Sequence, residues 1–188
     1  MKTIRSFIAV NISAKIRNKL EKIQDDLKES SAVLQLVRPE NIHITLRFLG
    51  NVPVESIKDI QNAIEESISG FKIFSVSFET IGVFPNPEYP RIIWVGIEKG
   101  REELSLLNTK IENSLSMFSL HQENRKFQPH LTIARVRSGK NRNELVNTLE
   151  ELKNIKLGEM FAKKICLMES MLKPQDAQYN TLKTFLLK

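Results

Sequence analysis

The sequence of 188 residues contains a single cysteine, Cys166, which has no partner for an intramolecular disulfide. A lone thiol is typical of proteins from reducing compartments, so a cytoplasmic location is expected. Cys166 lies in the apolar, strand-like run KKICLMES, where a buried structural thiol is expected rather than a nucleophile.

Long apolar runs are also absent. No stretch of about 18 apolar residues occurs, so no membrane-spanning helix is expected. The N-terminal MKTIRSFIAVNI has no long apolar segment followed by a small-residue cleavage site, so no secretion signal is expected. The seven glycines are scattered singly and form neither G-x-G-x-x-G nor G-x-x-x-x-G-K-[ST], which argues against a dinucleotide site or a P-loop.

The charge balance leans basic, with 28 Lys and Arg against 22 Asp and Glu and a net charge of +6. This excess favours an anionic partner such as RNA or a nucleotide, although many proteins carry such a charge for solubility alone. Hydrophobic residues make up 41% of the chain, enough for a packed interior at this length. No linker divides the sequence, so residues 1–188 are expected to form one domain, or two small lobes that share a core.

Two periodicities predict the secondary structure. Apolar residues that recur every three or four positions predict helices after Ser13, after Pro53, from about Arg101, and over NRNELVNTLEEL. Apolar and β-branched runs predict strands over TIRSFIAVN, AVLQLV, NIHITLRFL, FKIFSVSFETIGVF, RIIWVGIE, QPHLTIARVR, and on both sides of KPQDAQYN. The elements do not alternate as βαβα, so the sequence predicts an α+β fold with largely antiparallel sheets.

Two of the three histidines occur in near-copies of one tetrad, His-apolar-Thr-apolar: HITL from His43 and HLTI from His130. In a strand, residues two apart point to the same face. Each tetrad therefore presents one imidazole and one hydroxyl on one face and apolar side chains on the other. His121 has no such context and is expected to be a surface residue.

Two imidazoles and two hydroxyls suit displacement at phosphorus. One neutral imidazole can take a proton from the attacking oxygen, while a protonated one gives a proton to the leaving oxygen. The hydroxyls of Thr45 and Thr132 can donate hydrogen bonds to the phosphate oxygens. The tetrads contain no carboxylate, and the sequence has neither H-E-x-x-H nor C-x-x-C, so no metal or other cofactor is expected.

The paired tetrads, together with RFLG, RIIWVGI, FQPHLTIARV and KPQDAQY, resemble the two-histidine phosphoesterase superfamily. Within it they are most similar to the RNA 2′,3′-cyclic phosphodiesterases, historically named 2′–5′ RNA ligases. The resemblance implies a bilobal α+β fold: two lobes of mainly antiparallel sheet, related by a pseudo-twofold axis, with outer helices and a central cleft. It also implies an enzyme that opens RNA 2′,3′-cyclic phosphate ends to 2′-phosphomonoesters, with reversible 2′–5′ ligation as a minor activity. A monomer is expected.

The resemblance also implies roles for single residues. His43 is assigned as proton donor and His130 as proton acceptor, with Thr45, Thr132 and Arg135 as phosphate-binding residues. Strict alternation from His130 would turn Arg135 to the opposite face, so a bulge or strand end must intervene. The resemblance suggests two further substrate contacts, Phe7 and Arg125. For Trp94 and Tyr179 a place in the core is expected.

Other functions are compatible with the same residues. One is a phosphodiesterase acting on a small nucleotide, such as ADP-ribose cyclic phosphate or 2′,5′-oligoadenylate. Another is a non-catalytic RNA-binding protein that retains the cleft. The presence of both tetrads argues against the second, because the loss of one histidine is the simplest sign of an inactive enzyme.

Overall fold

A computed structural model describes residues 2–121, 126–172 and 177–188. In chain order its elements are β1 (Thr3–Asn11), α1 (Ala14–Glu29), β2 (Leu34–Leu36), β3 (His43–Pro53), α2 (Ile57–Ser67), β4 (Phe74–Phe84), β5 (Ile92–Ile97), α3 (Arg101–Leu115), β6 (His130–Val136), α4 (Arg142–Glu151), β7 (Lys156–Ala162), β8 (Lys164–Leu172) and β9 (Ala177–Leu186). Single 3₁₀ turns precede β3 (Pro39–Asn41) and α2 (Val54–Ser56). The α+β class is as predicted; the separate strand β7 was not anticipated.

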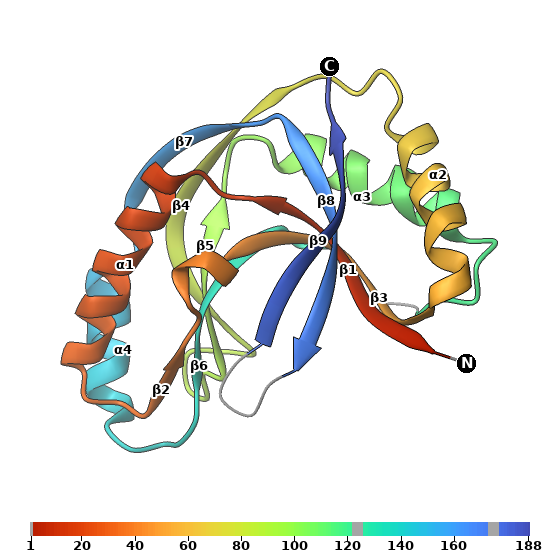
Figure 1. The fold of residues 1–188 in the computed structure, drawn as a ribbon. Coiled ribbons are helices and arrows are strands. Elements are labelled where there is room, and N and C mark those ends of the chain that lie inside the picture. The colour runs from red at the N-terminus through yellow and green to blue at the C-terminus, as the bar shows by residue number, and fades with distance from the viewer. Residues whose placement is uncertain (1, 122–125, 173–176) are drawn as a thin grey trace.

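The described strands form one curled sheet in the order β7-β4-β5-β6-β3-β1-β8-β9, with β2 paired to β6 (Figure 1). All of these pairings are antiparallel. The sheet has two halves of four strands. We call β3, β1, β8 and β9 the His43 half, and β6, β5, β4 and β7 the His130 half. A single residue pair, Ile44 with Leu131, joins β3 to β6 and therefore joins the two halves.

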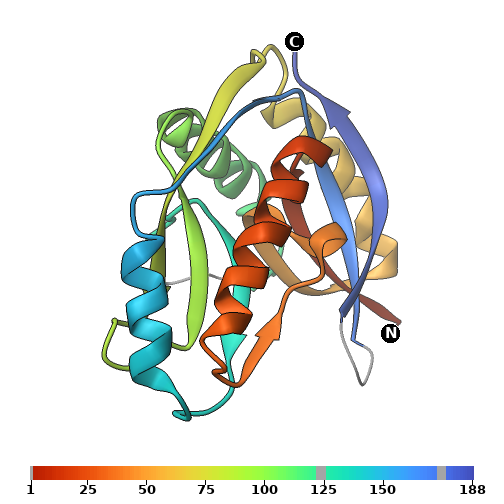
Figure 2. The same ribbon diagram turned by 90° about the vertical axis from the view of Figure 1, so that its left-hand side faces the viewer.

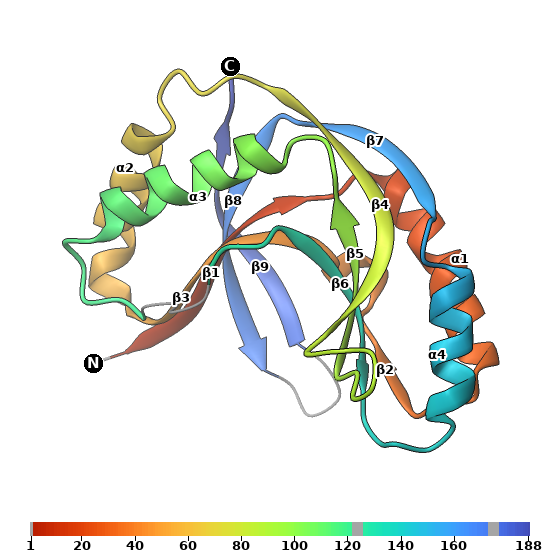
Figure 3. The ribbon, with the colours of Figure 1, turned by 180° about the vertical axis from the view of Figure 1, so that it is seen from behind.

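The helices cover the outside of the sheet in two pairs, and α1 and α3 each cross between halves. α1 follows β1 of the His43 half but packs with α4 beside β6 and β7 (Figure 2). α3 follows β5 of the His130 half but packs with α2 beside β3 (Figure 3). Each half is thus covered by a helix whose preceding strand belongs to the other half, which ties the two halves together.

The helices form where the sequence predicts them, because each has one apolar stripe to bury. In α1 the residues Ile16, Leu20, Ile23 and Leu27 are buried, and the Ser13 hydroxyl accepts a hydrogen bond from the Ile16 N–H at 3.4 Å as an N-cap. Cys166, 1% exposed, is buried as expected. None of the helices in the described ranges is long and apolar enough to cross a bilayer.

Candidate active site

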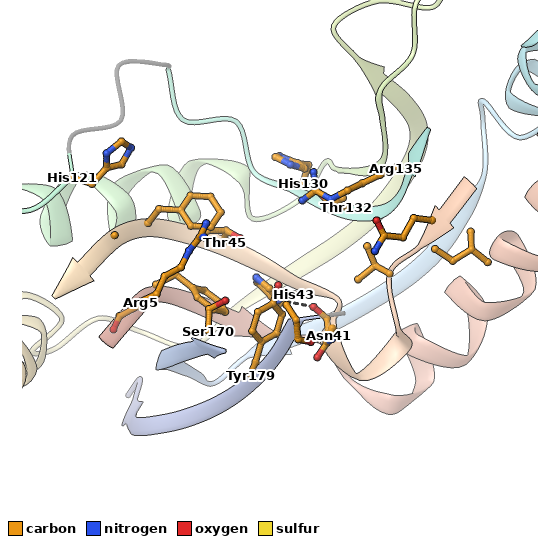
Figure 4. A pocket seen from close by; sticks show the side chains of 18 of the residues that line it. Arg5, Asn41, His43, Thr45, His121, His130, Thr132, Arg135, Ser170 and Tyr179 are labelled. Atoms are coloured by element: carbon orange, nitrogen blue, oxygen red, sulfur yellow. Dashed lines mark hydrogen bonds between the residues drawn. The ribbon is translucent and has the colours of Figure 1, made fainter. Parts of the chain in front are cut away.

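A cleft of about 740 Å³ opens where the two halves of the sheet meet. Both tetrads line it: His43 and Thr45 from β3, and His130 and Thr132 from β6. Figure 4 shows the two imidazoles on opposite walls of the cleft. The strand alternation predicted from the sequence is therefore confirmed for both tetrads.

The pairing of Ile44 with Leu131 explains why the two tetrads converge. Each is the second residue of its tetrad, each is fully buried, and the two strands run antiparallel. In an antiparallel pair, the residue after one partner lies beside the residue before the other. His43 is therefore directed to the side of Thr132, and Thr45 to the side of His130. The result is a quartet of side chains with twofold symmetry.

A β-bulge lies at the fourth residue of each tetrad. The extra residue in β3 is Leu46, which the register with β1 skips, and the extra residue in β6 is Ile133, which the register with β5 skips. Because alternation is shifted by one position after each bulge, Phe48 and Arg135 both line the cleft. The irregularity that Arg135 requires is thus confirmed, and its counterpart in the other half is a finding of the structure.

The carbonyl of each bulge residue is held by an amide from a crossing helix. Gln24 of α1 donates from Nε2 to the Ile133 carbonyl at 2.8 Å, and Asn108 of α3 donates from Nδ2 to the Leu46 carbonyl at 2.9 Å. A buried carbonyl left without a partner is costly, so these two bonds stabilise the bulges. The helices that tie the halves together therefore also fix the strand geometry beside the cleft.

Each imidazole is oriented by the backbone carbonyl of the residue two positions before it. Nδ1 of His43 lies 2.7 Å from the Asn41 carbonyl, and Nδ1 of His130 lies 2.7 Å from the Gln128 carbonyl. A carbonyl can only accept, so Nδ1 carries the proton and donates in both rings. In the neutral imidazoles, Nε2 is consequently the nitrogen with a lone pair available to a ligand.

Burial changes the proton affinity of both rings. It lowers the pKa of His43 from 6.5 to about 4; the hydrogen bond to Asn41 opposes this shift, and the charge of His130 adds to it. Burial also lowers the pKa of His130, against the hydrogen bond to Gln128. Both imidazoles are therefore mainly neutral at pH 7 in the unliganded protein.

Aromatic rings pack against each imidazole. Phe7 is 3% exposed and stacks on His43 with the ring centroids 4.8 Å apart, and the edge of Tyr179 approaches the same imidazole at 5.4 Å. On the other wall, Phe84 lies 5.3 Å and Trp94 6.3 Å from His130. Phe7 thus contacts the imidazole, while Tyr179, expected in the core, lines the cleft.

The cleft is positively charged. Three arginines line it, Arg5, Arg135 and Arg137, and none of the described lining residues is acidic. Arg137 also donates a hydrogen bond to the side chain of Gln35. Among the residues that the structure describes, no three His, Cys, Asp or Glu side chains gather into a group that could hold a metal ion. The arrangement suits an anion and two proton transfers.

Arg125, a suggested substrate contact, lies outside the described residues. His121 is exposed, as expected, but it also lines the cleft, at the end opposite Arg135 (Figure 4). Ser170 of β8 lines the cleft as well.

Known proteins resemble this chain along its whole length. The family model described as LigT like Phosphoesterase matches twice, over residues 10–94 and 95–179. A protein of Methanocaldococcus jannaschii named RNA 2′,3′-cyclic phosphodiesterase is 36% identical over 96% of this chain and 99% of its own length. One of the same name from Methanothermobacter thermautotrophicus is 34% identical over 97% and 98%. A crystal structure from Thermus thermophilus has a TM-score of 0.84 over 98% of both chains at 24% identity.

Proposed function

Because this chain belongs to the LigT-like phosphoesterase family, we propose that it hydrolyses RNA 2′,3′-cyclic phosphate ends to 2′-phosphomonoesters without a metal ion. The observation that carries the proposal is the twofold quartet of His43, Thr45, His130 and Thr132 around one cleft. Relatives that cover nearly the whole chain bear the name of this activity, which supports the assignment of substrate class.

In the proposed reaction, water attacks the phosphorus opposite the ribose 3′ oxygen. His130 accepts the proton of the water at Nε2 as the new P–O bond forms. His43 gives its Nε2 proton to the 3′ oxygen as the P–O3′ bond breaks, which leaves a 2′-phosphate and a 3′-hydroxyl. Thr45, Thr132 and Arg135 donate to the non-bridging oxygens, where negative charge accumulates in the transition state.

Burial lowers the pKa of both histidines, so the pair is mainly neutral in the free protein at pH 7. Burial lowers the pKa of His43 to about 4, so a protonated His43 would give its proton readily to the departing 3′ oxygen. In the free protein the required state, with His43 protonated and His130 neutral, is a minor one. A phosphate anion in the cleft favours the protonated imidazole and so increases the population of that state.

Two further features belong to the proposal. All four members of the quartet come from one chain, so a monomer is sufficient for catalysis. The lone cysteine supports a cytoplasmic location, where thiols stay reduced. With the 5′-hydroxyl of a second RNA in place of water, the same proton transfers would form a 2′–5′ bond as O3′ leaves. This ligation is a transesterification, and its reverse restores the cyclic phosphate and releases the 5′-hydroxyl.

The test is an oligoribonucleotide with a 2′,3′-cyclic end, incubated in excess EDTA, with the product identified by ³¹P NMR. We expect complete conversion to the 2′-phosphomonoester. Small substrates such as ADP-ribose cyclic phosphate and 2′,5′-oligoadenylate are assayed in parallel. A kcat/KM for a small nucleotide far above that for the RNA end would replace RNA as the substrate, and hydrolysis that EDTA abolishes and a divalent ion restores would refute the metal-free mechanism.

A further inference from the structure

A row of polar side chains crosses three neighbouring strands of the His43 half and lines the cleft beside the quartet. Its members are Asn51 of β3, Arg5 of β1 and Ser170 of β8. Arg5 is the direct partner of Asn51. On the other side of β1, the antiparallel register with β8 brings Ser170 next to Arg5 (Figure 4). We call these three residues the Arg5 row.

The Arg5 row lies on the same face of the sheet as the quartet, but at a distance from it. Phe7 stacks on His43, and Arg5, two positions earlier on β1, points to the same face as Phe7. Ala9 is the partner of Thr45, so Arg5 lies four residues, or about 13 Å, along β1 from the quartet. An arginine side chain covers only part of that length. The Arg5 guanidinium therefore stops short of the phosphate that reacts.

The Arg5 row offers hydrogen-bond donors and one positive charge. It contains a guanidinium, an amide and a hydroxyl, and none of the described residues that line the cleft is acidic. Within the described ranges, the Arg5 side chain has neither a hydrogen bond nor an ion pair, whereas the Arg137 side chain is bound to Gln35. A guanidinium can donate to two oxygens of one phosphate at once. The row therefore suits a second phosphate group.

We propose that the Arg5 row binds the phosphodiester that joins the terminal nucleotide of the RNA to the nucleotide before it. The inference rests on the proposed function, in which the quartet holds the 2′,3′-cyclic phosphate. Because the reacting nucleotide ends the chain, the next phosphate lies on its 5′ side. The terminal nucleotide then extends from the quartet to the row. Arg5 is accordingly a binding residue that favours the end of an RNA chain over a cyclic mononucleotide with a free 5′-hydroxyl.

Three substrates separate the contribution of this phosphate from that of the second nucleoside. They are adenosine 2′,3′-cyclic phosphate, the dinucleotide ApA with a 2′,3′-cyclic end, and the same dinucleotide with an uncharged methylphosphonate linkage. We expect kcat/KM for the charged dinucleotide to exceed that for each of the other two by about tenfold or more, the scale of a hydrogen bond to a charged group. Equal kcat/KM values for the charged and the uncharged dinucleotide would overturn the inference.

Arg5→Gln tests whether the row is responsible for this preference, because it removes the charge and keeps a polar side chain. The matched control is Lys2→Gln, which removes a charge from an exposed residue three positions earlier that does not line the cleft. The readout is the ratio of kcat/KM for the charged dinucleotide to that for the uncharged one. We expect a ratio close to one in Arg5→Gln and the wild-type ratio in Lys2→Gln.

Two outcomes of this comparison would count against the role of the row. A wild-type ratio in Arg5→Gln, or an equal loss of the ratio in Lys2→Gln, would show that the preference does not depend on Arg5. Failure of the wild-type protein to hydrolyse any of the three substrates would instead refute the proposed function.

Discussion

Ile44 and Leu131 are direct partners across β3 and β6, and this one residue pair joins the two halves of the sheet. Because each lies between the histidine and the threonine of its tetrad, the pairing fixes all four polar side chains relative to one another. The two histidines and two threonines are thus positioned by a residue pair that is fully inaccessible to solvent. A site on such a support is expected to be rigid.

Removal of either tetrad histidine should abolish most of the activity. His43→Ala and His130→Ala are each expected to lower kcat by about 10²–10⁴-fold, the contribution of one positioned proton-transfer group. His121→Ala removes the third histidine, which lines the cleft far from Arg135, and should cost less than about tenfold, below that proton-transfer range. The measurement is single-turnover kinetics with far-UV circular dichroism to verify folding. A loss in His121→Ala as large as in the other two would contradict the assignment.

The threonines should contribute through hydrogen bonds to the transition state. Thr45→Val and Thr132→Val keep the side-chain shape but remove the hydroxyl, and each should lower kcat by roughly 10–10³-fold, as the loss of one donor to a developing anion does. KM should change much less than kcat, because the hydrogen bonds strengthen as charge develops. An effect confined to KM would mean that the hydroxyls only bind the ground state.

Much of this site is predictable from the sequence because it depends on local periodicity. Alternation placed His43 with Thr45 and His130 with Thr132, and the need for Arg135 to share their face required a bulge. The bulge itself depends on Gln24, which approaches from a distant helix, and local spacing does not reveal that contact.

The remaining cleft residues are brought in by tertiary structure alone. Tyr179 enters through the pairing of β8 with β9, and an apolar, aromatic residue in a strand is as compatible with a core as with a cleft. His121 reaches the cleft because Gly50 has a φ of +72° and no side chain; a Cβ there would lie 3.0 Å from the His121 Cβ. For the orientation of the imidazoles the sequence does contain a local signal: Asn41 and Gln128, whose carbonyls bind the histidine Nδ1 atoms, each precede a histidine by two residues.

The pH dependence should reflect the buried imidazoles. Catalysis needs one histidine protonated and one neutral, so kcat/KM should fall below about 4, where the pair becomes fully protonated, and again above the lowered pKa of His130, where it becomes fully neutral. We expect the maximum of kcat/KM on the acid side of 6.5, the ordinary histidine pKa. The kcat profile should lie at higher pH, since bound phosphate raises both pKa values.

Stopped assays across a buffer series of constant ionic strength would measure both profiles. A maximum of kcat/KM above pH 7 would show that the two imidazoles are not the desolvated groups described above. Loss of one limb of the profile in His43→Ala or His130→Ala would attribute the titration to the pair.

The arginines should make RNA binding sensitive to salt. For single strands, log K falls with log salt by about 0.7 for each phosphate neutralised. Arg137→Gln removes one of the three cleft arginines and should reduce the slope by about that amount for an oligonucleotide. The control, Lys110→Gln, removes a charge from an exposed residue of α3 that does not line the cleft, and should leave the slope unchanged. Binding of an oligonucleotide that does not respond to salt would indicate a small-nucleotide enzyme.

The most direct test of two-histidine catalysis replaces the 3′ oxygen of the cyclic phosphate by sulfur, with EDTA present throughout. A thiolate leaves without protonation, so the substrate makes the general acid unnecessary. We predict that His43→Ala regains activity within about tenfold of the wild-type protein on this substrate, because the 10²–10⁴-fold contribution of the acid is no longer needed, while His130→Ala stays inactive. Rescue of His130→Ala alone would exchange the two roles. Rescue of neither variant would contradict the account, because no single histidine would then be acting as the acid.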